Sequence, residues 1–584
     1  MGKYGDFDDA RREYVITRPD TPRPWDNYIW NQAYYRYVDQ FGKGYSRYQT
    51  QKGQQTQLLF GAHNNPQDSR LLYLRDDETG AYWNPGWDPV QKTPERFTCR
   101  HGLGYTIIEN LTEGIEASDR IFVPLGGDPV EYWTVTLKNV SNRPRKLSLF
   151  TYAELSLAGA RTYGHMMFMS AHYHPQLKAV IARKRAEGLP HTKYGGFVAC
   201  DVEPAGYDGS ARAFVGPYRR VVNPIAVERG ACSNTPGSGE AVTGGLHVRV
   251  ELAPGEAKTV RFLAGVTDNV TPAESTRELI DRHLSADGFE KAFADLGGER
   301  AAKLAPIWVE TPDRDLDRLT NVWNKQQVDW GATWVRWGIK GYRDILQQAQ
   351  GIVTCDPELA RKDFLDACRF QYADGFALRG WDPIDKMAYA DSAQWMIGTI
   401  TEYVKETGDA AVLEETVPYF DAGEDTVLGH MLKAVRKLWS DRGAHGLSLI
   451  HYGDWNDSLT AVGTGGKGES VWLSMAFVRA CRLLAELAGF LAKPDLAAEM
   501  DKRGVSERVE AGSAMKFCLV AEGVADLYLR LNPTMEWDTA AGQAVLEGAG
   551  GSMTTLDGEP FIYNKESLKN PGFIAQGLRS GKVG

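Results

Sequence analysis

Residues 453–457 bring together several side chains that could do chemistry. Two carboxylates, an amide and an indole stand within four residues, and a glycine-rich loop and an apolar helix follow. The indole of Trp455 offers a flat face on which a sugar ring could stack. Asp457 could donate a proton if an apolar wall or a nearby anion keeps it protonated. The alternative interpretation is that Asp454 and Asn456 only shape a turn and that Trp455 belongs to the core.

The composition narrows the class of protein. A chain of 584 residues predicts about three or four domains. Its net charge of -10 argues against nucleic acid as the main partner. No run of 18 apolar residues is present, so we expect no membrane span. The seven cysteines contain no CxxC pair, and the N-terminus is polar and acidic, which favours a cytoplasmic protein with reduced thiols.

The elements that position these side chains fall into distinct regions. Alternating apolar and polar residues at 133–138 and 246–252, with a further run at 260–266, predict strands separated by turns. We therefore expect an antiparallel β-sandwich over residues 1–270. Thr271 followed by Pro272 predicts the start of a helix, which opens a helical linker over 271–311.

Residues 312–493 are predicted to be helical. Asp356 followed by proline is a strong helix start. Further helices are expected at 390–403, 426–439 and 470–491. Long, tryptophan-rich loops separate them, so we expect pairs of helices arranged as a toroid, with the loops meeting at one mouth, where sites usually lie.

The pattern changes again over residues 494–584. Residues 494–509 are polar, residues 511–520 read as a strand, and a short helix is expected between Glu536 and Gly551. We predict a short α/β segment here, unlike the regions before it.

Several segments, in order, resemble glycoside hydrolase family 94, the inverting disaccharide phosphorylases that include cellobiose phosphorylase. The likeness covers residues 4–490. It is carried by the N-terminal run at 4–25, GWDP at 86–89, CRHGLGY at 99–105, GIKGYRD at 338–344, YVKETGD at 403–409, RGAHG at 442–446, GDWND at 453–457 and KGESVW at 467–472.

The resemblance implies a β-sandwich, a helical linker and a partial (α/α)6 catalytic barrel. It also implies that Asp457 is the general acid and that Trp455 lies beside the donor sugar. The other positions that match the family's substrate contacts are Arg343, Asp344, Gln348 and Glu469.

The implied chemistry fits these residue types. An ordinary glycosidase uses two carboxylates, whereas a phosphorylase uses one acid, because inorganic phosphate is the nucleophile. The products would be α-glucose 1-phosphate and a free sugar. Arg343 is the best phosphate ligand, since a guanidinium can bind phosphate with two hydrogen bonds. We expect a disaccharide and phosphate as partners and no cofactor. Members of the family are often dimeric, so the resemblance also implies a homodimer.

The chain departs from the family's pattern in two places. The family usually has an aspartate where this chain has Gln348, which keeps hydrogen-bonding capacity but loses the charge. The family's barrel also continues further and supplies a histidine and a Thr-Gly pair to the phosphate. This chain leaves the pattern near Leu491, so we expect an impaired activity.

The following residues resemble the C-terminal end of the inositol-monophosphatase superfamily, and the 3'(2'),5'-bisphosphate nucleotidases above all. The carrying text is residues 512–523, 525–528, 533–542 and 563–565. Asp538 matches a metal ligand of that family, but the remaining ligands have no counterpart here. One carboxylate does not make a magnesium site, so Asp538 is an isolated remnant and we predict no metal.

These two incomplete patterns predict a fusion of a family 94 enzyme with a nucleotidase tail. Three functions follow as hypotheses. The first is a disaccharide phosphorylase of the cellobiose type, weakened by the missing barrel segment. The second is a nucleotidase-like phosphatase fragment, and the third is an inactive carbohydrate-binding chimera. The sequence names no particular disaccharide.

Overall fold

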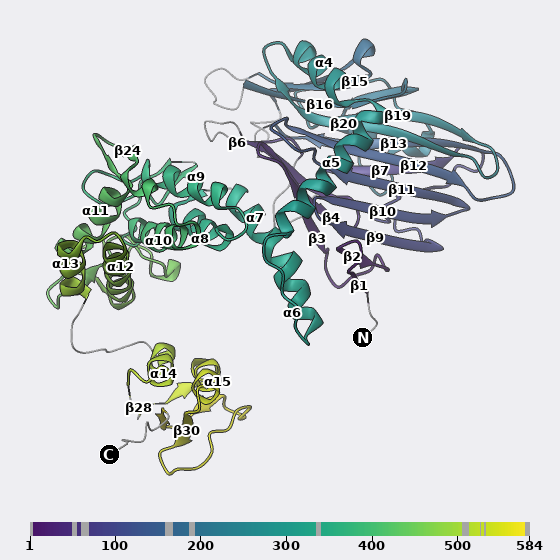
Figure 1. The fold of residues 1–584 in the computed structure, drawn as a ribbon. Helices are drawn as coiled ribbons and strands as arrows, with labels where there is room; N and C mark the ends of the chain where they lie inside the picture. The colour runs from purple at the N-terminus through teal and green to yellow at the C-terminus, as the bar shows by residue number, and fades with distance from the viewer. Residues whose placement is uncertain are drawn as a thin grey trace. The chain divides into compact units, whose positions relative to one another are not determined.

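The computed structural model forms two compact units, residues 1–500 and 501–584 (Figure 1). The described residues are 4–49, 55–59, 69–157, 167–185, 193–334, 340–382, 384–504, 513–525, 527–530 and 533–577. Within these ranges no helix is long and apolar enough to cross a membrane.

The first unit begins with antiparallel sheets. The largest has eleven strands, in the spatial order β1 (Gly5–Asp8), β2 (Glu13–Ile16), β9 (Arg96–Gly102), β10 (Tyr105–Thr112), β11 (Ile115–Phe122), β12 (Val130–Asn139), β20 (Ala257–Asp268), β16 (Tyr194–Cys200), β15 (Ala179–Lys184), β14 (Met169–His174) and β18 (Gly237–Ser238). A second sheet has the order β17 (Gly206–Ser210), β19 (Val242–Leu252), β13 (Arg145–Leu155), β7 (Arg70–Asp76) and β8 (Tyr82–Trp83). A third contains β3 (Asp26–Trp30), β4 (Tyr34–Asp39), β5 (Gly44–Gln49) and β6 (Gln55–Gln57). Short helices in this region are η1 (Pro175–Leu177), α2 (Ala211–Val215) and α3 (Ile225–Arg229).

Strands β10 and β11 show why these sequences form layers. Their side chains alternate between buried and half-buried positions, so one face of each strand points inward. Ile115 and Ile121 share one buried core with Leu74 and Leu149 from the second sheet. The predicted strands at 133–138, 246–252 and 260–266 lie in β12, β19 and β20, and the predicted antiparallel sandwich is confirmed.

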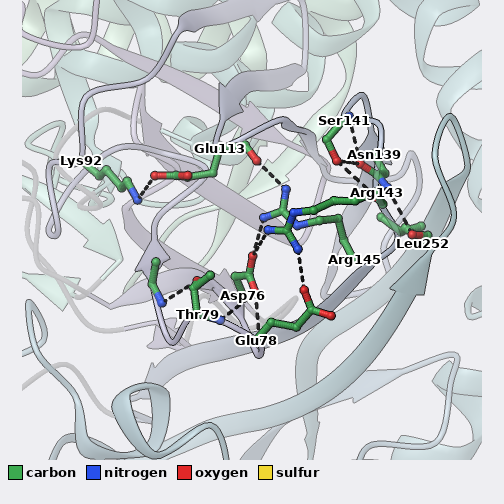
Figure 2. A network of polar contacts seen from close by, with 11 residues as sticks. Asp76, Glu78, Thr79, Lys92, Glu113, Asn139, Ser141, Arg143, Arg145 and Leu252 are labelled. Atoms are coloured by element: carbon green, nitrogen blue, oxygen red, sulfur yellow. Dashed lines mark hydrogen bonds and ion pairs between the residues drawn. The ribbon is translucent and has the colours of Figure 1, made fainter.

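A buried ionic network ties the sheets together (Figure 2). Both Arg143 and Arg145 point at Asp76, the last residue of β7, with N–O distances of 3.2 and 2.7 Å. Arg145 also donates to the carbonyl of Glu113 in the turn between β10 and β11. Arg143 pairs in addition with the exposed Glu78. One carboxylate therefore holds two guanidinium groups and, through Arg145, a turn of the other sheet.

Helices make up the rest of the first unit. In chain order they are α4 (Pro272–His283), α5 (Ala286–Leu304), α6 (Arg314–Arg318), the π-helical turn η3 (Leu319–Trp323), α7 (Asn324–Trp334), α8 (Tyr342–Ile352), α9 (Pro357–Cys368), η4 (Ser392–Gln394), α10 (Trp395–Thr407), η5 (Ala411–Glu414), α11 (Val427–Ser440), η6 (Asp457–Leu459), α12 (Val471–Phe490) and α13 (Pro494–Gly504). Short strands between them are β21 (Lys340–Gly341), β22 (Gly380–Asp382), β23 (Ile384–Asp385), β24 (Thr416–Pro418), β25 (Glu424–Thr426), β26 (Ser448–Leu449) and β27 (Glu469–Ser470).

Three predicted helix starts are confirmed by their caps, whereas the helix predicted from residue 390 begins later, with η4 at Ser392 and α10 at Trp395. Asp356, Thr426 and Ser470 each accept a hydrogen bond from the backbone N–H three residues further on. Gly408 ends α10 in the left-handed conformation that favours glycine. Helices α7 to α12 pack around a common apolar core. Within the described ranges these helices do not form a closed barrel, which does not contradict the partial barrel that was predicted, and the predicted fold class is confirmed.

The linker helix α5 is attached at both of its ends. Near its start, Phe289 stacks on Tyr132 of β12, with ring centroids 4.1 Å apart. Near its end, Arg300 donates to Asp329 of α7 at 2.7 Å and to the carbonyl of Trp30 at 3.2 Å. These contacts fix the first helices of the helical region against the sandwich.

The second unit has a small core of its own. Its elements are α14 (Ser513–Ala521), β28 (Leu527–Arg530), β29 (Thr534–Met535), η7 (Glu536–Asp538), α15 (Ala540–Gly548), β30 (Ser552–Thr555), β31 (Lys569–Asn570) and β32 (Phe573–Gln576). The sheet has the order β28-β32-β30, so β28 is an edge strand. Tyr528 of β28 is buried, whereas its neighbours Leu527 and Leu529 are half-exposed.

The strand predicted at residues 511–520 is wrong where the structure describes it. Residues 513–521 form helix α14, and residues 511–512 lie outside the described ranges. Phe517 and Val520 are both buried, three positions apart, which is the spacing of a helix face. The run is short and mostly apolar, so its period could not be read from the sequence.

Candidate active site

The loop that carries residues 453–457 runs from β26 to β27 and the start of α12. Asp454 is buried beneath it. Its Oδ2 accepts from the Ser470 hydroxyl and its Oδ1 accepts from the Asn456 N–H at 2.9 Å. Asn456 in turn accepts from the N–H of Ser458 at 3.1 Å. Because Ser470 also caps α12, Asp454 fixes the loop to that helix, and the turn-shaping interpretation of Asp454 and Asn456 is confirmed.

Trp455 does not belong to the core, since 51% of it is exposed. Its ring lies against Trp472 of α12, with centroids 5.9 Å apart and planes at 20°. Trp472 lies in turn against Trp395, the first residue of α10, at 5.9 Å and 33°. We call Trp455, Trp472 and Trp395 the tryptophan series. Its outer member keeps an exposed aromatic surface on which a flat, partly apolar ligand could stack.

Asp457 and Arg343 meet across the loop and α8. The Asp457 side chain is 64% exposed, and its Oδ1 accepts from Nη2 of Arg343 at 2.6 Å. Nη1 of Arg343 donates to the backbone carbonyl of Asp454 at 3.0 Å. The structure therefore brings the predicted acid and the predicted phosphate ligand together, and Asp457 lies two positions after Trp455 in the loop.

Asp391 joins this cluster, although the sequence did not single it out. It is 1% exposed, and its Oδ2 accepts from Nε1 of Trp395 at 2.9 Å. The same oxygen lies 3.6 Å from Nη1 of Arg343. Its Oδ1 has no hydrogen-bond partner among the described residues. Burial raises the pKa of Asp391 to about 6, against the hydrogen bond from Trp395 and the charge of Arg343.

Asp344 and Gln348 lie on α8, but they point to different neighbours. Asp344 is exposed and its carboxylate folds back over the helix start, where a Cβ at Gly341 would be 2.0 Å from its Oδ2. The amide of Gln348 lies against Gly331 of α7, where a Cβ would be 2.5 Å from Oε1. Asp344 is thus next to Arg343 in the first turn, whereas Gln348 lies more than a turn further along α8.

Glu469 holds a neighbouring turn. Its Oε1 accepts from the backbone N–H of His445 at 2.9 Å, and its Oε2 lies 3.1 Å from the Nδ1 of that residue. A Cβ at Gly443 would be 1.9 Å from Oε1, so the carboxylate sits directly against this backbone. Glu469 is therefore engaged with residues 443–445.

The C-terminal unit offers little for a divalent cation. The Oδ2 of Asp538 accepts from the N–H of Met535 at 2.9 Å, which closes its own turn. Throughout the ranges described, no group of three or more histidine, cysteine, aspartate or glutamate side chains is arranged to hold a metal ion. The residues present do not fit the magnesium site that this type of segment implies.

Three family models match the chain. Residues 12–285 match the glycosyl hydrolase 94 supersandwich domain, and residues 301–511 match the catalytic domain of the glycosyl hydrolase 94 superfamily. Residues 488–578 match the inositol monophosphatase family. The second and third matches overlap over residues 488–511, and the boundary between the two compact units, at 500 and 501, lies inside that overlap.

Individual relatives agree with this division. Solabiose phosphorylase of Paenibacillus borealis is 42% identical over 496 residues, which are 84% of this chain and 63% of that protein. The 3'(2'),5'-bisphosphate nucleotidase CysQ of Escherichia coli (strain K12) is 46% identical over 83 residues, which are 14% of this chain and 34% of that protein. The chain spans less than two thirds of the length of the phosphorylases that it matches.

A solved structure supports the fold alone. A bacterial glucoamylase complexed with acarbose superimposes with a TM-score of 0.51 and 8% sequence identity, covering 90% of this chain and 72% of that one. The larger part of the chain, residues 12–285 and 301–511, therefore belongs to glycoside hydrolase family 94, and it is joined to a C-terminal segment of the inositol monophosphatase family.

Proposed function

We propose that the chain is an inverting glycoside phosphorylase. Its substrate would be a β-linked glucodisaccharide of the cellobiose type, and inorganic phosphate would convert it to α-glucose 1-phosphate and a free sugar. The observation that carries this proposal is the pairing of Asp457 with Arg343 beside the exposed face of Trp455. The identity to a solabiose phosphorylase supports the same class of reaction.

Each member of this group has a part in the proposed reaction. The donor sugar stacks on Trp455. Asp457 gives its proton to the oxygen of the leaving sugar while the bond from that oxygen to the anomeric carbon breaks. A phosphate oxygen bonds to the same carbon from the opposite face, so the configuration inverts and one carboxyl group is sufficient.

The contact between Arg343 and Asp457 suggests how phosphate engages the acid. Arg343 donates to Oδ1 of Asp457, so the guanidinium is already directed at the site. A phosphate dianion competes for the guanidinium, because it carries more charge and can accept two parallel hydrogen bonds. Arg343 then turns to phosphate and releases Asp457, which acts as the general acid.

We also propose roles for the remaining site residues. Asp344, Gln348 and Glu469 contact the sugars; for Glu469 this requires release from His445. The reaction needs no cofactor besides phosphate as co-substrate. We also propose a cytoplasmic homodimer that acts on small molecules and not on nucleic acid.

A second candidate is a carbohydrate-binding chimera without catalysis. The chain covers only 63% of its solabiose phosphorylase relative, and its C-terminal unit matches another family. A weakened phosphorylase lies between the two candidates. A nucleotidase-like phosphatase is less well supported, because Asp538 is used to close its own turn.

Phosphorus NMR separates the candidates. The purified chain is incubated with inorganic phosphate and cellobiose, laminaribiose, chitobiose or solabiose. We expect a sugar 1-phosphate from at least one of them, lost in Asp457→Asn and kept in Asp295→Asn, an exposed and ion-paired carboxylate on α5. If no sugar gives product although sugars still change the tryptophan fluorescence, the binding chimera is correct and the phosphorylase is not.

A further inference from the structure

The segment before α10 is joined to the candidate site through its backbone. Two hydrogen bonds, of 2.9 and 3.1 Å, connect residues 388–390 with residues 452–453. Tyr389 also forms β-bridges with His451 and Gly453, on either side of Tyr452. Asp391 lies two residues after Tyr389, so its position is fixed relative to the loop that carries Trp455 and Asp457.

The carboxylate of Asp391 is not used for local capping. Asp391 occupies the N-cap position of η4, but its side chain makes no cap hydrogen bond. Its Oδ2 instead contacts two side chains, the indole N–H of Trp395 at 2.9 Å and the guanidinium of Arg343 at 3.6 Å. A buried carboxylate is costly, so these two contacts indicate what it serves.

The contact with Trp395 leads to the sugar-stacking surface. Trp395 is the inner member of the tryptophan series, and its indole is oriented by the hydrogen bond to Asp391. Trp472 packs on Trp395, and Trp455 packs on Trp472, each at 5.9 Å between centroids. The tilt of the exposed indole of Trp455 therefore depends on the orientation of the partly buried indole of Trp395, because packed rings move together.

The contact with Arg343 leads to the reacting groups. Arg343 reaches the site from the first turn of α8, and its two terminal nitrogens are divided between partners. Nη2 binds Asp457 at 2.6 Å, whereas Nη1 binds the carbonyl of Asp454 and faces Asp391. The negative charge of Asp391 holds Nη1 inward, which leaves Nη2 directed at Asp457 or, in the proposed reaction, at phosphate.

We propose that Asp391 is a positioning residue that sets the tryptophan series and the Arg343–Asp457 pair together, through one buried oxygen. This inference rests on the proposed phosphorylase function for its kinetic consequence, but not for its structural one. Sugar stacking and acid–phosphate geometry would thus share one anchor, and loss of that anchor would disturb both.

Four variants separate the two contacts. Asp391→Asn keeps an oxygen acceptor for Trp395 but removes the charge that faces Arg343. Trp395→Phe removes the indole donor and keeps that charge. Asp391→Ala removes both. Asp363→Asn is the matched control, since Asp363 is also buried in this region, with an oxygen that lacks a partner among the described residues and a pKa that burial raises to about 7.

The expected results differ between the variants. Asp391→Asn should lower kcat about tenfold or more with KM for the disaccharide within about threefold, because only the reacting groups are misplaced. Trp395→Phe should weaken sugar binding about three- to tenfold, while kcat changes less. Binding is measured by tryptophan fluorescence with the best disaccharide of the NMR panel. Asp391→Glu should restore part of the kcat that Asp391→Ala loses. If Asp391→Asn is kinetically equal to Asp363→Asn, the positioning role is wrong.

A ligand-free readout keeps the test independent of the proposed function. Near-ultraviolet circular dichroism reports on stacked tryptophans, so Asp391→Ala and Trp395→Phe should alter that signal, whereas Asp391→Asn and Asp363→Asn should not. A crystal structure of Asp391→Asn should show Arg343 turned from Asp457. If the wild-type chain forms no sugar phosphate but these two results hold, the phosphorylase proposal fails and the positioning inference stands. An unchanged dichroism signal in Asp391→Ala overturns the inference itself.

Discussion

Asp76 in the sandwich and Asp391 in the helical region are almost equally buried, with 2% and 1% of the residue exposed. Their oxygens are satisfied very differently. Asp76 accepts four hydrogen bonds, from the backbone of Glu78 and Thr79 and from the side chains of Arg143 and Arg145. Asp391 accepts one, from Trp395, and its Oδ1 lacks a partner within the described ranges.

The two environments change the carboxyl groups in opposite directions. Burial alone would raise the pKa of Asp76, but the N–H of Glu78 and the guanidinium of Arg145 outweigh it and hold that pKa below its usual value. At Asp391 burial wins, and the pKa is raised to about 6. The hydrogen bonds to a buried carboxylate such as Asp76 thus stabilise its ionised form, and with it the fold. A buried carboxylate with an oxygen that lacks a hydrogen-bond partner destabilises the fold, and such groups are frequent at functional sites.

We expect the largest effect on stability from removal of the Asp76 carboxylate, which accepts four hydrogen bonds. Asp76→Ala leaves the 2%-exposed guanidinium of Arg145 buried without its anion. We expect the free energy of unfolding to fall by about 3–5 kcal/mol, measured by urea titration at pH 7. A loss below about 1 kcal/mol, the range of surface ion pairs, would show that this network does not stabilise the sandwich.

The second prediction is a pH dependence of opposite sign at the two sites. For Asp391 the pKa is higher in the folded chain, near 6, than the usual value of about 4 for the unfolded chain. Wild type should therefore lose up to about 3 kcal/mol of stability relative to Asp391→Asn as the pH rises from 4 to 7.

For Asp76 the pKa is lower in the folded chain, so its contribution is present above the unfolded value and disappears on acidification. Relative to Asp76→Asn, wild type should lose stability as the pH falls below about 4. Urea titrations across this pH range measure both differences. Curves of the same sign for the two pairs would contradict the comparison.

The third prediction concerns Asp454, a buried carboxylate that accepts two hydrogen bonds, more than Asp391 and fewer than Asp76. Ser470→Ala removes both the cap of α12 and the hydroxyl that donates to Asp454. We expect a loss of about 1–2 kcal/mol in the free energy of unfolding. Thr426→Ala removes a cap alone and should cost less, so equal losses would mean that Asp454 does not depend on Ser470.

The smallest effect is expected at the exposed edge of the sandwich network. Glu78 pairs with Arg143, and both side chains are close to half-exposed. Truncation of its side chain in Glu78→Ala should change the free energy of unfolding by about 0–1 kcal/mol, and by less at high salt. A loss as large as that of Asp76→Ala would mean that the whole network, and not its buried carboxylate, determines stability.

Much of the fold could be predicted from local sequence. The helix starts at Pro357, Val427 and Val471 follow from caps that sit directly before them. The alternating strands of the sandwich carry a clear period of two. Helix α14 could not be predicted in this way, because its apolar run is too short to show which period it follows.

The candidate site could be predicted only in part. Asp457, Trp455 and Arg343 stand in motifs, whereas Asp391 owes its place to the backbone bridges of Tyr389 with His451 and Gly453, more than 60 positions along the chain, and to a hydrogen bond with Trp395. Nothing in a single isolated aspartate signals such a contact. The same is true of Asp76, whose arginine partners lie almost 70 residues further along the chain.

The edge strand β28 has a practical consequence. Leu527 and Leu529 are half-exposed along it, and its outer backbone groups form one rim of the three-stranded sheet. An open, apolar strand edge is a template on which another chain can add a strand. Concentrated samples should therefore begin to aggregate through the C-terminal unit, and a lysine in place of Leu529 should extend the storage life of the protein.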